Sequence, residues 1–258
     1  MPVAAGLHYF LHEGGTTTRP PLVLIHGAGG DHLFWPPEMR RLAGRRIFTI
    51  DLPGHGRSEG PGCQSLPDYT EHVIDLLDAA GISRAALIGH GMGGGVALTL
   101  ALDHPERVAG IGLIASGARL PVSAAILENA ANPATYSRAL DALRALMGSA
   151  RTAPQVKERV FKYYAALRPT VLHGDLHACD RFDVTDQLED ILCPVLVVCG
   201  AEDRLTPPRY SESMAERIPG AALQTIDGAG HLLMLEQPRR LAGLVNVFLA
   251  TIPYTPGM

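Results

Sequence analysis

The amino-acid sequence predicts an α/β fold with a mostly parallel central sheet and helices on both faces of that sheet. Short apolar runs rich in Val, Ile and Leu recur along the chain, and such runs are typical of strands buried on both faces. Helical stretches lie between the runs, and regular alternation of strand and helix builds a parallel sheet. The length of 258 residues allows one or two domains, and α/β folds often use such a length as one unit with an insertion.

Six apolar runs are expected as strands and four intervening stretches as helices. The expected strands are residues 22–25, 47–50, 85–88, 111–115, 195–199 and 222–226. The expected helices are residues 66–80, 96–104, 211–217 and 238–250. Pro105 and Pro238 lie where a proline punctuates a helix, and Gly81 follows the first helix as a C-terminal cap would. These signals therefore agree with the expected helix boundaries.

The alternation stops between about residues 117 and 186. Helical patterns and tyrosines occur in this stretch without a convincing strand. We therefore expect a helical insertion at residues 117–186, carried by a core that consists of residues 1–116 and 187–258.

Composition and charge argue against several classes of protein. The chain carries 22 Lys and Arg against 26 Asp and Glu, and the net charge of −4 does not suit a nucleic-acid-binding surface. Its four cysteines lack the spacing of metal ligands, so we expect reduced thiols and no metal. The first residues lack the features of a signal peptide, and the longest apolar region, residues 85–102, is interrupted by His90 and glycines. We expect a cytoplasmic protein that binds neither nucleic acid nor membrane.

A glycine-rich segment, Gly89-His90-Gly91-Met92-Gly93-Gly94-Gly95, joins the strand at 85–88 to the next helix. One mechanism that uses such a turn is the dinucleotide fingerprint G-x-G-x-x-G, which Gly89, Gly91 and Gly94 match formally. Its acidic partner is missing, because the strand at 111–115 is followed by no carboxylate that could bind a ribose hydroxyl, although Arg119 could favour a phosphorylated ribose. We therefore expect no bound nucleotide.

The other mechanism is the nucleophile elbow G-x-S-x-G, in which Gly91 takes the place of the serine. Four further motifs support it, because each follows an expected strand at the edge where ligands bind. They are His26-Gly27-Ala28-Gly29-Gly30, the segment 51–58 with the sequence DLPGHGRS, Gly200-Ala201-Glu202-Asp203-Arg204, and Gly228-Ala229-Gly230-His231.

Together these motifs resemble the α/β-hydrolase superfamily, in its branch of capped esterases, enol-lactonases and C–C hydrolases. The resemblance covers essentially the whole chain, and the family order of nucleophile, acid and histidine falls on Gly91, Asp203 and His231. It implies that His231 is the general base, that Asp203 orients it, and that the backbone N–H groups of Ala28 and Met92 form the oxyanion hole.

The resemblance also implies a ligand and a cap. It implies a small-molecule ester or related acyl substrate, no metal and no organic cofactor. The insertion at residues 117–186 would be a helical cap whose aromatic side chains line an apolar pocket above Gly91. Neither the acyl and alcohol groups, nor the choice among ester, enol-lactone and C–C bond, nor the oligomeric state follows from the sequence.

Gly91 departs from the family pattern, because glycine has no hydroxyl and cannot form an acyl-enzyme. Three explanations remain open. The chain could be an inactivated variant of a serine hydrolase, which we favour because the acid, the base and both oxyanion loops still match. It could be a natural enzyme in which an Asp203–His231 dyad activates water or abstracts a substrate proton. It could also be a non-catalytic protein that binds a small molecule.

The remaining histidines are interpreted as structural. His26, His55 and His90 lie in the glycine-rich loops and are expected to support them by hydrogen bonding. His173 and His177, with Asp175 between them, have helical spacing but no further ligand pattern, so we do not expect them to bind a metal.

Overall fold

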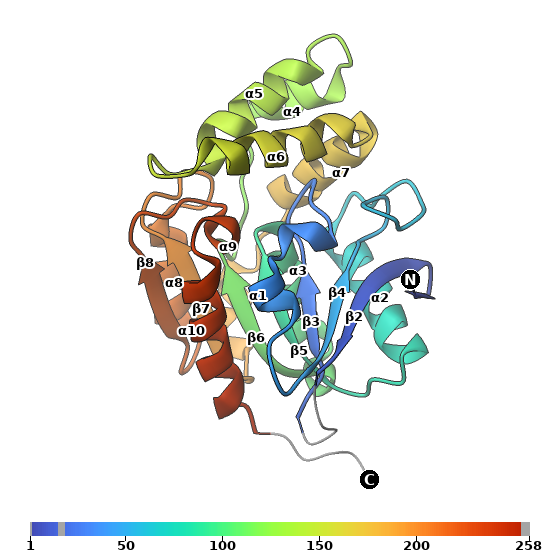
Figure 1. The fold of residues 1–258 in the computed structure, drawn as a ribbon, viewed down its shortest axis with the longest axis vertical. Helices are drawn as coiled ribbons and strands as arrows, with labels where there is room; N and C mark the ends of the chain where they lie inside the picture. The colour runs from blue at the N-terminus through green and yellow to red at the C-terminus, as the bar shows by residue number, and fades with distance from the viewer. Residues whose placement is uncertain (1, 15–18, 254–258) are drawn as a thin grey trace.

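The computed structural model describes residues 2–14 and 19–253, and its centre is an eight-stranded sheet (Figure 1). The strand order is β1-β2-β4-β3-β5-β6-β7-β8, with the first two strands antiparallel and the other six parallel. This arrangement confirms the predicted mostly parallel sheet. The strands are β1 (Val3–Ala4), β2 (Leu7–Glu13), β3 (Leu22–Ile25), β4 (Arg46–Ile50), β5 (Ala85–His90), β6 (Val108–Ile114), β7 (Val195–Gly200) and β8 (Ala222–Ile226).

All six predicted strands are present, but the sequence analysis missed β1 and β2. β2 carries polar side chains such as His8 and His12, and most of its residues are only half-buried. It lies near the edge of the sheet and pairs antiparallel with β4. A strand in that position need not be a continuous apolar run, because one of its faces can meet water.

Helices cover both faces of the sheet, as predicted. Along β3 the side chains of Leu22 and Leu24 join one apolar cluster, whereas those of Val23 and Ile25 join the other, because successive side chains point to opposite faces. The first cluster packs under α1 and α10, and the second packs under α2, α3 and α8. These helices are α1 (Pro37–Arg40), α2 (Leu66–Ala79), α3 (Met92–Asp103), α8 (Pro208–Arg217) and α10 (Pro238–Thr251).

Helix α3 begins at Met92, four residues before the predicted start. The three glycines that follow Met92 weaken the helical signal, but the first of them, Gly93, allows the close approach of α3 to the end of β3 that is described below. In the part of the chain that the structure covers, none of the helices has the length and apolar character needed to cross a membrane.

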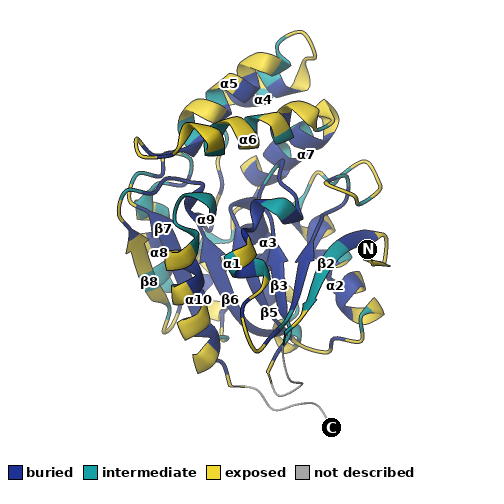
Figure 2. Ribbon diagram, in the orientation of Figure 1, coloured by how far each residue is buried: buried dark blue, intermediate teal, exposed yellow. Residues whose placement is uncertain are grey.

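Four helices lie between β6 and β7, in the region where an insertion is expected. They are α4 (Ala124–Ala131), α5 (Tyr136–Met147), α6 (Pro154–Ala166) and α7 (Pro169–Asp180), and we refer to them as the α4–α7 segment. Figure 1 shows this segment above the end of the sheet at which the parallel strands terminate. Figure 2 shows exposed residues along the outer surfaces of α4, α5 and α6, whereas the strands beneath are largely buried. The segment therefore covers the edge where the loops after β3, β5, β7 and β8 meet.

Short helical elements complete the chain. They are α9 (Leu233–Glu236) and the 3₁₀ turns η1 (His32–Phe34), η2 (Pro105–Arg107) and η3 (Thr185–Asp190).

Candidate active site

Gly91 occupies the turn between β5 and α3, with φ of 52° and ψ of −115°. Residues with a Cβ rarely adopt this conformation, whereas glycine adopts it readily. The turn is held on both sides, because the Gly91 N–H donates to the carbonyl of Ile114 at 3.0 Å and the Ser116 hydroxyl donates to the Gly91 carbonyl at 2.8 Å. The backbone at position 91 is therefore fixed by the neighbouring strand.

The residues two positions before and after Gly91 must also be glycine. A Cβ at Gly89 would overlap the backbone of Gly93, and a Cβ at Gly93 would overlap the carbonyl oxygen of Ile25. Strand, turn and helix thus approach one another as closely as they do in a nucleophile elbow. The glycines at both ends of the motif are required by this packing.

His231 and Asp203 lie on the loops after β8 and β7, and the structure brings them together. His231 Nδ1 lies 3.0 Å from Asp203 Oδ2. The other oxygen, Oδ1, accepts the N–H groups of Leu205 and Thr206, both at 2.9 Å, and the Thr206 hydroxyl donates to Oδ2 at 2.7 Å. Burial alone would raise the pKa of Asp203, but the charge and hydrogen bond of His231, together with hydrogen bonds from the backbone and side chain of Thr206, lower this pKa below its usual value. The carboxylate therefore stays ionised and holds the proton of His231 on Nδ1.

The other ring nitrogen, His231 Nε2, faces Gly91. A Cβ built on Gly91 would lie 3.3 Å from Nε2. A C–O bond of about 1.4 Å and an O–H···N hydrogen bond of about 2.8 Å, meeting at a roughly tetrahedral angle, would place a serine Cβ about 3.5 Å from that nitrogen. The backbone at position 91 therefore stands where a serine would need to stand to reach His231.

Ala28 and Met92 line the same cavity as Gly91 and His231. The cavity has a volume of about 590 Å³, including the space that is open to solvent. Most of its remaining lining is apolar and comes from the α4–α7 segment and the loops beside it, as in Leu120, Pro121, Val122, Leu143, Met147, Leu172 and Leu176. Of the aromatic residues in residues 117–186, Tyr164 lines the cavity, whereas Tyr163 packs against Phe34. The lining in the described part of the chain includes no Asp, Glu, Lys or Arg.

Comparison with known proteins agrees with this geometry. Residues 20–238 match the model of a family described as alpha/beta hydrolase fold. The chain belongs to this family. It is a hydrolase of the α/β-hydrolase type, which confirms the resemblance found in the sequence.

Three similar proteins cover nearly the whole hydrolase chain. The 2-hydroxymuconate semialdehyde hydrolase of Pseudomonas putida is 34% identical, over 96% of this chain and 92% of its own. The "Putative carbamate hydrolase RutD" of Caulobacter sp. strain K31 is 31% identical, over 95% and 96%. A solved structure of a thermophilic esterase from Thermogutta terrifontis has a TM-score of 0.84 and 28% identity, and covers 95% of this chain and 93% of its own.

The histidines in the loops of the hydrolase support the backbone, as expected. His26 Nδ1 bonds to the Gly27 carbonyl at 2.8 Å, and its Nε2 accepts the N–H of Leu52 at 3.0 Å. His90 Nε2 bonds to the carbonyl oxygen of His231 at 2.9 Å. Burial, followed by the neighbouring histidine, lowers the pKa of His26 to about 4 and that of His90 to about 3. Both rings are therefore neutral at pH 7.

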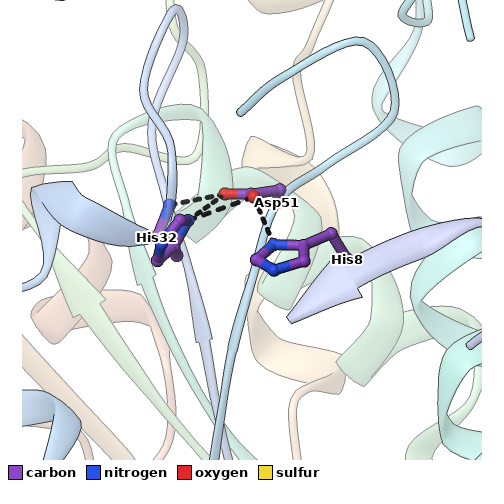
Figure 3. Close-up of side chains that lie close together, drawn as sticks. All are labelled: His8, His32 and Asp51. Atoms are coloured by element: carbon purple, nitrogen blue, oxygen red, sulfur yellow. Dashed lines mark hydrogen bonds and ion pairs between the residues drawn. The ribbon is translucent and has the colours of Figure 1, made fainter. Parts of the chain in front are cut away.

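The sequence analysis missed a buried cluster of His8, His32 and Asp51. Figure 3 shows the two imidazole rings on either side of the Asp51 carboxylate. Its oxygens lie 2.7 Å from His8 Nδ1 and 2.8 Å from His32 Nδ1, and they also accept the backbone N–H groups of His32 and Arg57. These residue types can bind a metal, and their possible ligand atoms lie within 4.8 Å of one another. The carboxylate is already shared among four donors, however, which fits a hydrogen-bonded hub for the loops after β3 and β4.

Asp51→Ala is expected to destabilise the hydrolase by about 3–5 kcal/mol, because it leaves the donors around a fully buried carboxylate without a partner. Urea unfolding at pH 7 measures this. Asp78→Ala is the control, since Asp78 pairs with Arg107 at the surface and should contribute less than about 1 kcal/mol. A loss at Asp51 no larger than that of the control would contradict the role of the hub.

The stability gap between the parent chain and Asp51→Ala should depend on pH. Burial would raise the pKa of Asp51, but hydrogen bonds from His32 and Arg57 outweigh burial and hold the pKa well below its usual range. A carboxylate with a lowered folded-state pKa stabilises the fold above its unfolded pKa of about 3.9. Its contribution shrinks as the pH falls below the unfolded pKa and is lost once the pH has fallen through the folded pKa. Unfolding measured from pH 6 to pH 3 should therefore show a narrowing gap at the acid end.

Proposed function

We propose that this chain is a carboxylic ester hydrolase of the serine type in which Gly91 stands at the nucleophile position, so that the chain as it stands is catalytically impaired. The observation that carries the proposal is the distance of 3.3 Å between a Cβ built on Gly91 and His231 Nε2. This is close to the separation that a serine–histidine hydrogen bond requires, so it supports position 91 as the nucleophile position.

Each neighbouring group has a role in such a reaction. With a serine at position 91, His231 Nε2 would accept its proton while the oxygen attacks the ester carbonyl, and would later return the proton to the leaving alcohol. Asp203 would hold the imidazole in the tautomer that leaves Nε2 free, because it accepts the proton on Nδ1. The N–H groups of Ala28 and Met92 would stabilise the charge on the carbonyl oxygen. A water molecule would then release the acid by the same route.

The cavity supports an uncharged acyl group as the substrate. Apolar side chains of the α4–α7 segment cover the site, so we propose this segment as the lid of the cavity. A substrate carboxylate would find no cationic side chain among the residues that line the described cavity. The esterase from Thermogutta terrifontis supports ester hydrolysis. The names of the semialdehyde hydrolase and of RutD leave C–C bond and carbamate cleavage as alternatives.

A second candidate function follows from the missing side chain. With glycine at position 91, a water molecule can approach His231 Nε2 directly, and the Asp203–His231 dyad could activate it without an acyl-enzyme. The two functions differ in their covalent chemistry. The dyad would be supported if the unchanged chain hydrolyses esters slowly and His231→Ala abolishes that hydrolysis. Treatment with a fluorophosphonate should then add no mass to the chain.

Narrowing the cavity should change selectivity for acyl length. In the Gly91→Ser chain, Val122→Trp should reduce hydrolysis of p-nitrophenyl octanoate relative to the acetate by about tenfold or more, because a pocket discriminates by about 1–3 kcal/mol per methylene. The ratio of kcat/KM for the two esters measures this. Val156→Trp, at a part-buried position of α6 that is outside the cavity lining, is the matched control. Equal losses on both esters would contradict a lid that selects acyl length.

A further inference from the structure

Two side chains of the α4–α7 segment hold one peptide group of the loop after β3. The Tyr164 hydroxyl on α6 donates to the carbonyl of Ala28 at 2.6 Å. The Asp175 Oδ2 atom on α7 accepts the N–H of Gly29 at 2.8 Å. That carbonyl and that N–H belong to the same peptide bond, which is planar. Bonds at both ends of this plane fix its orientation.

Packing restrains the same peptide from a third direction. Gly29 has φ of +66°, and a Cβ built there would lie 2.6 Å from Cε1 of the Tyr164 ring. The ring therefore lies directly against the Gly29 backbone. Burial, followed by the charge of Asp175, raises the pKa of Tyr164, so that its hydroxyl keeps the proton that it donates.

Asp175 is itself held rigidly from the core. It is fully buried and accepts hydrogen bonds from His55 Nε2 at 2.8 Å and from the Tyr69 hydroxyl at 2.5 Å. These partners come from the loop after β4 and from α2. A buried carboxylate with three donors has little freedom to move, since each displacement would break a hydrogen bond in a medium without water.

We propose that Tyr164 and Asp175 are positioning residues that orient the oxyanion donor at Ala28. This inference rests on the proposed function, in which the Ala28 N–H stabilises the developing charge. Fixing the Ala28–Gly29 peptide limits the torsions of Ala28, and these torsions set the direction of its N–H. Preorganised donors lose much of their effect when they are misplaced, and a displacement of about 1 Å can reduce the rate by about 10²-fold. The lid is thereby part of the catalytic apparatus as well as of the pocket.

The kinetic test uses the Gly91→Ser chain. Asp175→Asn should lower kcat by about 10- to 100-fold and Tyr164→Phe by about threefold to tenfold, with KM changed by less than about threefold, because a misdirected donor weakens the transition state more than the ground state. The pH dependence set by the Asp203–His231 pair should not move. Tyr163→Phe and Asp183→Asn are the matched controls, since Tyr163 packs against Phe34 and Asp183 accepts the N–H of Thr185. A rise in KM at unchanged kcat would overturn the proposal, because it would show weaker substrate binding without any loss of transition-state stabilisation.

A binding test on the unchanged Gly91 chain separates this inference from the proposed hydrolysis. The probes are a butylphosphonate monoester, whose anionic oxygen mimics the tetrahedral intermediate, and the neutral amide of the same chain length. Calorimetry should show that Tyr164→Phe and Asp175→Asn weaken phosphonate binding about threefold to tenfold or more and change amide binding by less than about twofold. Equal weakening of both probes, or of neither, would overturn the positioning role.

The two tests fail differently. If Gly91→Ser hydrolyses no ester but both variants still weaken phosphonate binding selectively, the oriented anion site stands and the proposed hydrolysis fails. If Gly91→Ser is active and neither variant lowers kcat, the positioning role fails and the proposed function stands. Should Asp175→Asn fail to fold, Tyr164→Phe removes one hydroxyl and decides the result.

Discussion

Gly91→Ser is expected to raise hydrolysis of a short-chain p-nitrophenyl ester by several orders of magnitude. Loss of a catalytic serine reduces turnover on the order of 10⁶-fold and leaves only the contribution of binding and the oxyanion hole, about 10³–10⁴-fold over water. The Cβ of the new serine would lie 3.3 Å from His231 Nε2. Initial rates of the parent and variant chains measure the gain. His231→Ala added to the variant should abolish it, because the hydroxyl is a weak nucleophile without its base.

Gly91→Ala is the matched control for this substitution. It introduces the same Cβ at φ of 52° without the hydroxyl, so it should show the strain and none of the activity. Either side chain should reduce the free energy of unfolding by at most about 1–3 kcal/mol. If Gly91→Ser folds with His231 in reach and hydrolyses none of a broad panel of esters and lactones, the serine-hydrolase proposal is wrong. The dyad or a binding function would then take its place.

Asp203→Asn in the Gly91→Ser chain is expected to reduce kcat by about 10⁴-fold. The carboxylate accepts the proton on His231 Nδ1, and an amide at that position would favour the opposite tautomer, in which Nε2 carries the proton and cannot act as a base. KM should change little, because Asp203 does not line the cavity. Steady-state kinetics at pH 7 measure both constants.

A surface carboxylate provides the control for this loss. Asp186 is fully exposed and pairs with Arg217 at 3.6 Å, so Asp186→Asn should leave kcat unchanged within about twofold. Circular dichroism shows whether each variant is folded. A loss of less than tenfold in folded Asp203→Asn would contradict its role in orienting His231.

The sheet and the proximity of Gly91, Asp203 and His231 could be predicted because both depend on local patterns. A strand buried on both faces is mostly apolar, so β3, β5 and β7 are visible as runs rich in Val, Ile, Leu and Ala. Parallel strands end at one edge, so the residues that directly follow them must gather there. Asp203, His231 and Gly91 follow three such strands, and the structure brings them together. β2 was missed because a half-buried strand does not show this pattern.

The tertiary structure alone decided which distant side chains complete the loops. Asp175 lies 146 positions from Gly29 along the chain, and Tyr164 lies 136 positions from Ala28. Asp175 stood out in the sequence only as a neighbour of His173 and His177, yet it binds the loop after β3, His55 and Tyr69. Asp51 likewise forms a hydrogen bond with His8, which lies 43 positions away along the chain. Local patterns determine which segments form strands and helices, whereas a hydrogen bond depends on distances of about 3 Å that only the packing of whole elements sets.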